Sequence, residues 1–209
     1  MNFIKIKLLV IAVIMFAASS AFASLSYDVT VDTSSLSGST GYLYLQFNPL
    51  SGNTSDATAV VSNFATNGTL GVQDTTNIGF GGNVSGTLPG TVTFDNGYGT
   101  GFTKSGINDY NQAITFGTSF SFSVLLTQAL NNPATDGSSF TLSLFQDAIG
   151  LSPLKTANGT LVTLNLNSDG TATPTITDAG TTATPIPAAA WLLGSGLMGL
   201  AGIRRRMNA

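Results

Sequence analysis

The amino-acid sequence predicts an all-β protein, an antiparallel β-sandwich, and three observations lead to this fold class. Apolar and polar residues alternate along several segments, which is the period of a strand with one buried face. Turn-forming Asn, Asp and Gly residues separate those segments at short intervals. Only 8% of the residues are charged and 24 are glycine, a composition that suits strands joined by tight turns.

The expected strands follow in order along the chain. Leu25–Val31 has an apolar residue at every odd position, and Phe120–Leu126 and Phe140–Leu144 repeat this alternation. Tyr42–Phe47 is apolar on both faces, which indicates a central strand. Weaker patterns predict strands at residues 57–64, 90–94, 111–116, 161–166 and 172–177.

Turn signals separate the expected strands, among them Asn67-Gly68, Asp136-Gly137 and Asp169-Gly170. We expect the single helical turn within residues 147–156. These elements predict one jelly-roll-like domain over residues 24–177, and a small polar stalk follows it at residues 178–184.

The first 23 residues have the layout of a secretory signal peptide. Lys5 and Lys7 give a positive start, an apolar stretch follows, and Ala21 and Ala23 form a small-x-small cleavage site before Ser24. A signal anchor that stays in the membrane is the alternative, but the short apolar stretch favours cleavage by leader peptidase. The sequence therefore predicts an exported chain that begins at Ser24.

The C-terminal segment, residues 185–209, combines three features. Pro185-Ile186-Pro187 precedes an uncharged run at residues 188–203, and Arg204-Arg205-Arg206 follows as a basic stop. A helix over that run would be roughly 24 Å long, somewhat shorter than the hydrocarbon core of about 30 Å. We expect a short transmembrane helix whose arginines stay in the cytoplasm.

This order of features, from Thr184 to Arg206, resembles the PEP-CTERM sorting signal of Gram-negative bacteria, most closely its Val-Pro-Leu-Pro-Ala variant. The resemblance implies recognition by an exosortase, a membrane cysteine protease that cleaves near the proline motif, and a host that makes exopolysaccharide and biofilm matrix. Ile186 stands where the usual form has Glu, which leaves the exosortase type open. A glycosylphosphatidylinositol signal usually lacks such arginines, and a sortase pentapeptide is absent, so a plain single-span anchor is the main rival.

The composition of the mature domain excludes several function classes. From Ser24 to Pro185 it holds ten Asp, two Lys and no Arg, Glu, His or Cys, a formal charge of −8. That charge argues against nucleic acid as a partner. Without His and Cys, the commonest general base, the thiol nucleophile and the usual zinc ligands are missing. Two Asp could still serve glycoside hydrolysis, but most Asp lie in turns, so we do not expect an enzyme.

Two weaker patterns suggest binding sites. Asn165, Asn167 and Asp169 resemble the start of a Ca²⁺ loop, but the twelfth position is Ile176, and a hairpin turn explains the same residues. Tyr98 and Phe102, in a glycine-rich segment, offer rings that could stack on sugars, with core packing as the alternative.

Segments 26–32 and 43–48 also resemble uncharacterised exported domains found with such tails, which adds only support for the fold. We expect an exported surface or extracellular-matrix protein, associated with exopolysaccharide and biofilm, that is anchored in the inner membrane until an exosortase processes it. A carbohydrate-binding module is the second hypothesis and a divergent Asp-dependent hydrolase the third. No cofactor is expected beyond weakly bound Ca²⁺.

Overall fold

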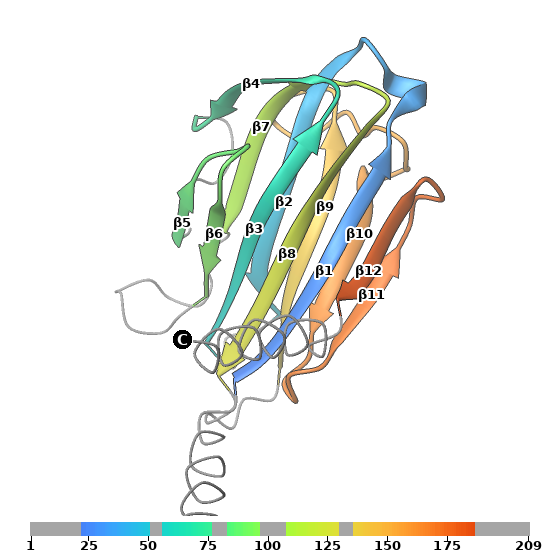
Figure 1. Ribbon diagram of the computed structural model, residues 1–209. Coiled ribbons are helices and arrows are strands. Elements are labelled where there is room, and N and C mark those ends of the chain that lie inside the picture. Colours follow the sequence, from blue (N-terminus) through green and yellow to red (C-terminus); the bar gives the residue numbers. More distant parts are fainter. Residues whose placement is uncertain (1–21, 51–55, 77–82, 97–107, 130–135, 187–209) are drawn as a thin grey trace, which may run out of the picture.

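The computed structural model describes residues 22–50, 56–76, 83–96, 108–129 and 136–186. Within them, two six-stranded antiparallel sheets pack face to face, with β1, β3 and β8 in the front sheet of Figure 1 and β2 and β9 behind. The prediction of an all-β antiparallel sandwich is therefore confirmed. A short 3₁₀ helix, η1 (Ser34–Leu36), joins the first two strands.

The front sheet, here called sheet A, contains both the first and the last strand of the described chain. Its strands, in spatial order, are β12 (Thr181–Ile186), β1 (Phe22–Asp32), β8 (Ser119–Ala129), β3 (Ala57–Thr66), β6 (Val92–Asp95) and β5 (Asn83–Gly86). β1 therefore lies between β8 and β12, and β12 forms one edge of the sheet.

The second sheet, sheet B, is built around β2. Its strands, in spatial order, are β11 (Ala172–Ile176), β10 (Thr160–Leu166), β9 (Ser138–Phe145), β2 (Thr40–Pro49), β7 (Asp109–Thr115) and β4 (Thr69–Asp74). Consecutive strands alternate between the sheets from β1 to β5 and again from β6 to β9, so the chain wraps around the core.

The core forms where the alternating residues of both sheets meet. In β1, Tyr27, Val29 and Val31 are buried while the residues between them face solvent. Phe94 of sheet A packs edge-on against Phe140 of sheet B, with ring centroids 6.3 Å apart. Each such fully buried apolar side chain contributes roughly 1.5–3 kcal/mol, so this layer holds the two sheets together without disulfides.

A buried polar network joins the two sheets near the ends of β6 and β9. The Asn108 side chain donates to the Phe47 carbonyl (3.0 Å) and accepts from the Asn83 backbone N–H (2.8 Å). Asn96 donates to the Ser138 hydroxyl over 3.0 Å. These groups satisfy one another, as buried polar groups must, so we assign the network a structural role.

Three sequence expectations differ from the structure. Residues 178–184, expected as a polar stalk, contribute a turn and most of strand β12. Residues 147–156 contain turns and a β-bridge from Phe145 to Pro153 rather than a helical turn. Strands β4 and β5 were not anticipated, because each is short and at a sheet edge.

The predicted signal peptide up to Ala21, and the tail from Pro187 with its expected helix at 188–203 and its arginines, lie outside the described residues. Within the described part of the chain, no helix has the length and apolar character needed to cross a membrane.

Candidate functional site

The structure places part of each predicted processing segment on neighbouring strands. β12 runs antiparallel to β1, with Ser26 opposite Ile186 and Tyr27 opposite Pro185. The start of β1 and the end of β12 therefore lie at the same end of the sandwich (Figure 1). Ala23 belongs to β1 and pairs with Gln128 of β8. Pro185 is exposed on the edge strand, where its missing N–H is tolerated.

A lysine ties the turn before β12 to the far end of β1. Lys155 Nζ lies 3.1 Å from the Asp178 carboxylate and also donates to the Asp32 carbonyl. Asp178 in turn accepts from the Thr181 hydroxyl over 2.7 Å, and the Thr181 N–H donates to the Asp178 carbonyl over 3.0 Å. These contacts fasten the last strand to the first.

The residues of the predicted Ca²⁺ loop lie in and beside the β10–β11 hairpin. Asp169 accepts from the backbone N–H (2.9 Å) and the hydroxyl (2.7 Å) of Thr171, and the hydroxyl bond is the main reason that its pKa lies below the ordinary value. The Asn167 amide donates to the Thr171 hydroxyl over 2.9 Å, and Asn165 pairs with Thr173. Turn chemistry accounts for these contacts.

Within the described ranges, no group of three His, Cys, Asp or Glu side chains is arranged to hold a metal ion. The Ca²⁺ site therefore stays a prediction. The predicted sugar-stacking residues Tyr98 and Phe102 lie outside the described residues, so their role also stays a prediction.

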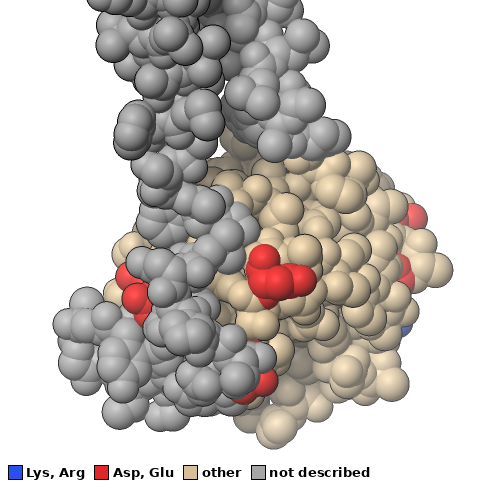
Figure 2. Space-filling view, turned by 90° about the horizontal axis from the view of Figure 1, so that it is seen from below, with Lys and Arg blue, Asp and Glu red and all other residues tan. Residues whose placement is uncertain are grey.

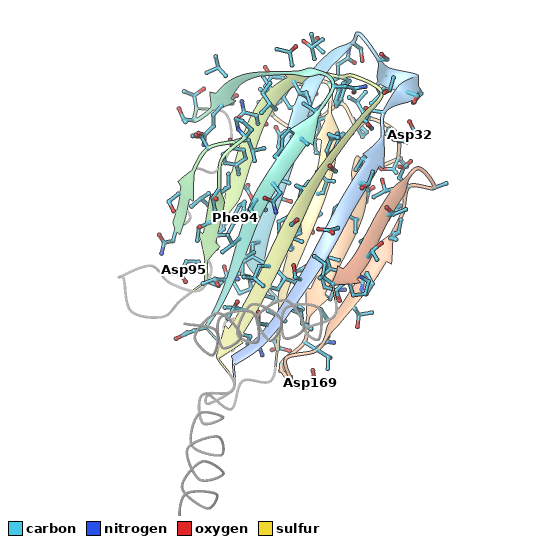
Figure 3. All side chains as sticks on the ribbon, viewed as in Figure 1. Asp32, Phe94, Asp95 and Asp169 are labelled. Atoms are coloured by element: carbon cyan, nitrogen blue, oxygen red, sulfur yellow. The ribbon has the colours of Figure 1, made fainter. Side chains whose placement is uncertain are left out.

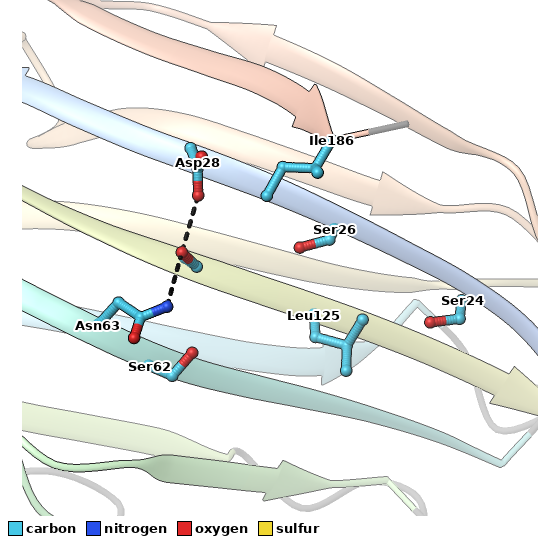
Figure 4. A pocket seen from close by; sticks show the side chains of 8 residues that line it. Ser24, Ser26, Asp28, Ser62, Asn63, Leu125 and Ile186 are labelled. Atoms are coloured by element: carbon cyan, nitrogen blue, oxygen red, sulfur yellow. Dashed lines mark hydrogen bonds between the residues drawn. The ribbon is translucent and has the colours of Figure 1, made fainter. Parts of the chain in front are cut away.

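A shallow polar groove crosses the outer face of sheet A, over strands β12, β1, β8 and β3 (Figure 4). Its volume is about 580 Å³, and Leu125 and Ile186 are its apolar members. Its polar members are Ser24, Ser26, Asp28, Ser62, Asn63 and Ser123.

Three of these polar side chains form a hydrogen-bonded chain across the strands. Ser123 donates to Asp28 over 2.7 Å, and Asn63 donates to Ser123 over 3.3 Å (Figure 4). Asn63 lies at a β3 bulge with a φ of 55°, a left-handed conformation that asparagine tolerates better than most residues. The bulge turns its side chain toward the groove. The sequence has no histidine, the commonest general base for activating a serine.

A second hollow, of about 390 Å³, lies on the outer face of sheet B where β4, β7 and β2 meet. Ala113 is at its centre, Tyr42 flanks it on β2, and Gly71 flanks it on β4. Thr40, Thr69, Thr115 and Gln146 also line it. We call this feature the sheet B hollow.

Beside the hollow, the paired residues Tyr44 and Asn111 on the same face are covered by the connection between β9 and β10. Tyr44 and the Asn111 amide both donate to the Ala148 carbonyl. Burial, followed by the charge of Asp147, raises the pKa of Tyr44. Asn111 Oδ1 is buried and has no hydrogen-bond partner within the part of the chain that the structure describes.

Asp147 shapes that connection. Its carboxylate accepts from the backbone N–H groups of Ile149 (3.0 Å), Leu151 (3.1 Å) and Ser152 (2.6 Å). These hydrogen bonds, with the one from Leu151 the largest contribution, lower its pKa to about 2. The carboxylate is therefore ionised at any ordinary pH and holds the loop in a tight conformation. Gln146, the first residue after β9, lines the sheet B hollow.

Asp109 is the buried carboxyl of the described chain, with 5% of its surface exposed. It lies opposite Gln46, whose amide donates to it over 2.8 Å. Burial raises its pKa to about 6, and the Gln46 hydrogen bond only partly offsets this. A raised carboxyl pKa is a property of general acids, but this group is closed to solvent.

The labelled carboxylates do not converge on one place. Figure 3 shows Asp32 at one end of the sandwich, Asp169 at the opposite end and Asp95 at the end of β6. Seen from below, acidic side chains occupy separate places on a surface that is mostly uncharged, with a small basic area at one edge (Figure 2). A hydrolase with two carboxylates needs them roughly 5–10 Å apart, so Asp32 and Asp169 cannot form such a pair.

Comparison with protein-family models found no match, and comparisons with curated proteins and with solved structures found none either. A function for this chain must therefore be inferred from its own sequence and structure.

Sequence reasoning missed the sheet B hollow because Tyr42–Phe47 is apolar at every position but Gln46. The signal was present in the tyrosines: Leu43, Leu45 and Phe47 are fully buried, so Tyr42 and Tyr44 face outward. The opposing Gly71 and Ala113 were not recognisable as neighbours, since strand pairing is not readable from one strand.

Proposed function

We propose that this chain is an exported surface or extracellular-matrix protein whose β-sandwich is displayed by a C-terminal sorting tail. The observation that carries this proposal is the antiparallel pairing of β1 with β12, which brings residues 23 and 186 to one end of the sandwich. A leader and a tail that leave a domain at the same end can both reach one membrane, while the opposite end of the sandwich points away from it.

We propose leader peptidase and an exosortase as the processing partners, because the N-terminal cleavage site and the C-terminal sorting segment described above fit these enzymes. The register of β12 adds a requirement, because Pro185 and Ile186 are paired with β1 in the folded domain. Cleavage near this motif requires either a site beyond Ile186 or release of the end of β12 from β1. Either way, the folded domain limits how closely an enzyme can approach the motif.

The proposed surroundings are a hydrated polysaccharide matrix. The alternation of consecutive strands between sheets supports the jelly-roll-like form of the sandwich, an architecture that lectin domains share with many unrelated proteins. Such an analogy does not assign a function by itself. The Asp-dependent hydrolase is less well supported, since Asp109, with its raised pKa, is buried.

The test is cell fractionation of the full-length chain in a Gram-negative host that has an exosortase. Pro185→Ala with Pro187→Ala should leave membrane insertion intact and stop cleavage, so an anchored precursor accumulates. Replacing Arg204, Arg205 and Arg206 with neutral residues removes charges that cost about 2.5–3.5 kcal/mol each at mid-bilayer, and processing should be lost. Release of the double-proline variant at the wild-type rate would contradict the proposal and leave a plain anchor.

A further inference from the structure

Sheet B is interrupted at the hollow by a bulge. The pairing of β4 with β7 passes from Leu70–Ile114 to Gln73–Gln112, so two residues of β4, Gly71 and Val72, face the single residue Ala113 of β7. A Cβ on Gly71 would lie 2.9 Å from the Ala113 Cβ. Glycine therefore lets the two strands approach and leaves the floor without a covering side chain.

The bulge is supported from inside the sandwich. The buried Gln112 amide donates to the Gly71 carbonyl over 2.5 Å, and the Tyr110 hydroxyl donates to Gln112 over 2.5 Å. Tyr110 in turn accepts from the Leu88 backbone N–H over 2.9 Å. A hollow whose floor is held by buried hydrogen bonds exists before any ligand arrives, which lowers the cost of binding.

The lining combines one aromatic ring, small residues and neutral polar groups. Tyr42 is half-buried beside the floor, while Thr40, Thr115 and Gln146 are exposed at the rim. Val72, directly after Gly71, is 83% exposed. An aromatic or apolar surface beside hydroxyl and amide groups matches a sugar ring, which has an apolar face and a polar edge.

Charge separates this ligand class from others. The lining contains no ionisable carboxylate and no cation, and the mature domain carries a formal charge of −8. A polyanion would be repelled by that net charge, and no group here could pair with it. A neutral glycan carries no such penalty. The volume of about 390 Å³ is in the range of small-molecule sites.

We propose that the sheet B hollow binds a neutral polysaccharide, with Tyr42 stacking on one sugar ring over Ala113 and with the threonines and Gln146 bonding its hydroxyls. This inference rests on the proposed function for the presence of a polysaccharide around the protein. It assigns the binding to the face of sheet B, away from the processing segments on sheet A.

The experiment measures binding of the full-length chain, purified in a detergent without a sugar headgroup, to three neutral polysaccharides: laminarin, dextran and galactomannan. Alginate serves as the anionic comparison. Affinity gel electrophoresis and titration calorimetry should show binding to at least one neutral polymer and none to alginate. Tyr42→Ala should weaken that binding at least tenfold because the stacking surface is gone.

Ala113→Leu provides a second, independent test, since it fills the floor without removing a polar group. It should also weaken binding at least tenfold. Thr175→Leu is the matched control, because it adds the same kind of bulk on the exposed outer face of β11 and should leave binding unchanged. Thermal melts of all variants show whether each is folded.

The inference is overturned if the wild type binds none of the three neutral polymers, or if both folded variants bind as the wild type does. The proposed function has a separate readout. A chain that is exported and processed but binds no glycan refutes the sugar site alone, whereas a chain that binds glycan but is never exported refutes the proposed function alone.

Discussion

At the scale of single residues, two charged side chains decide how the sandwich responds to its surroundings. Asp109 is a carboxyl that the fold keeps from water, and Lys155 is a cation that the fold uses to join three segments. Ionisation of Asp109 lowers the stability of the folded state, whereas Lys155 raises it through its contacts with Asp178 and Asp32.

Asp109→Asn should make the protein more stable at neutral pH. The folded pKa of about 6 is above the ordinary value of 3.8, so between these pH values the folded state holds a proton that the unfolded state has lost. The contribution of Asp109 to stability therefore falls as pH rises through this window. At pH 8 the variant should gain on the order of 2 kcal/mol. Urea unfolding of both proteins at pH 4, 6 and 8 measures the difference, and an equal difference at all three values would contradict it.

Lys155→Met should loosen the join between β12 and β1. The pair with Asp178 has side chains that are 9% and 11% exposed, so its loss should cost more than the ~1 kcal/mol of an exposed pair and less than the ~3–5 kcal/mol of a fully buried one. A double-mutant cycle with Asp178→Asn, read by thermal unfolding, measures the coupling. A coupling energy near zero would show that the contact contributes nothing.

At the scale of elements, the interior strands were predictable and the edge strands were not. β1, β8 and β9 place their apolar residues on the buried face and mainly polar ones on the other, so alternation marks them in the sequence. β12 reads Thr-Thr-Ala-Thr-Pro-Ile and is mostly exposed, since it packs along only one edge. Its order comes from pairing with β1 and from Lys155, and neither is visible in its own residues.

The candidate sites also divide into those with a local sequence signal and those that depend on strand pairing. The turn at Asp169 was readable because its signal is local, with Asp and Gly adjacent to Thr171. The sheet B hollow brings together strands from residues 40–49, 69–74 and 109–115. A site assembled by pairing across such distances needs the register, which a single sequence does not provide.

Removing β12 should destabilise the domain without changing its fold. A chain of residues 24–180 loses the pairing of β1 over residues 26–31, whereas a chain of 24–187 keeps it. We expect the shorter chain to melt several degrees lower, since 1 kcal/mol shifts the midpoint by roughly 2–4 °C at this size. Far-UV circular dichroism should show strand-rich spectra for both. Equal midpoints would mean that β12 adds no stability.

At the scale of the whole molecule, the pairing of β1 with β12 would link folding to the proposed processing. Ala23→Arg should block leader cleavage because that site requires a small side chain. Ala23 also lies within β1, opposite Gln128, so the uncleaved chain should still form the sandwich. N-terminal sequencing should find Ser24 in the wild type and Met1 in the variant. Ser24 at the N-terminus of the variant would place the cleavage determinant elsewhere.

The pairing of the first strand with the last also determines when the fold can be completed. Ser26 and Ile186 are opposite each other but 160 positions apart, and a chain that emerges at about 5–20 residues per second needs roughly 8–30 s to supply the second after the first. During that time one edge of β1 has no neighbour, and an open edge strand invites pairing with other chains. If the chain is exported as proposed, sheet A can close only once the residues up to Ile186 have crossed the membrane, so the edge of β1 is protected late in export.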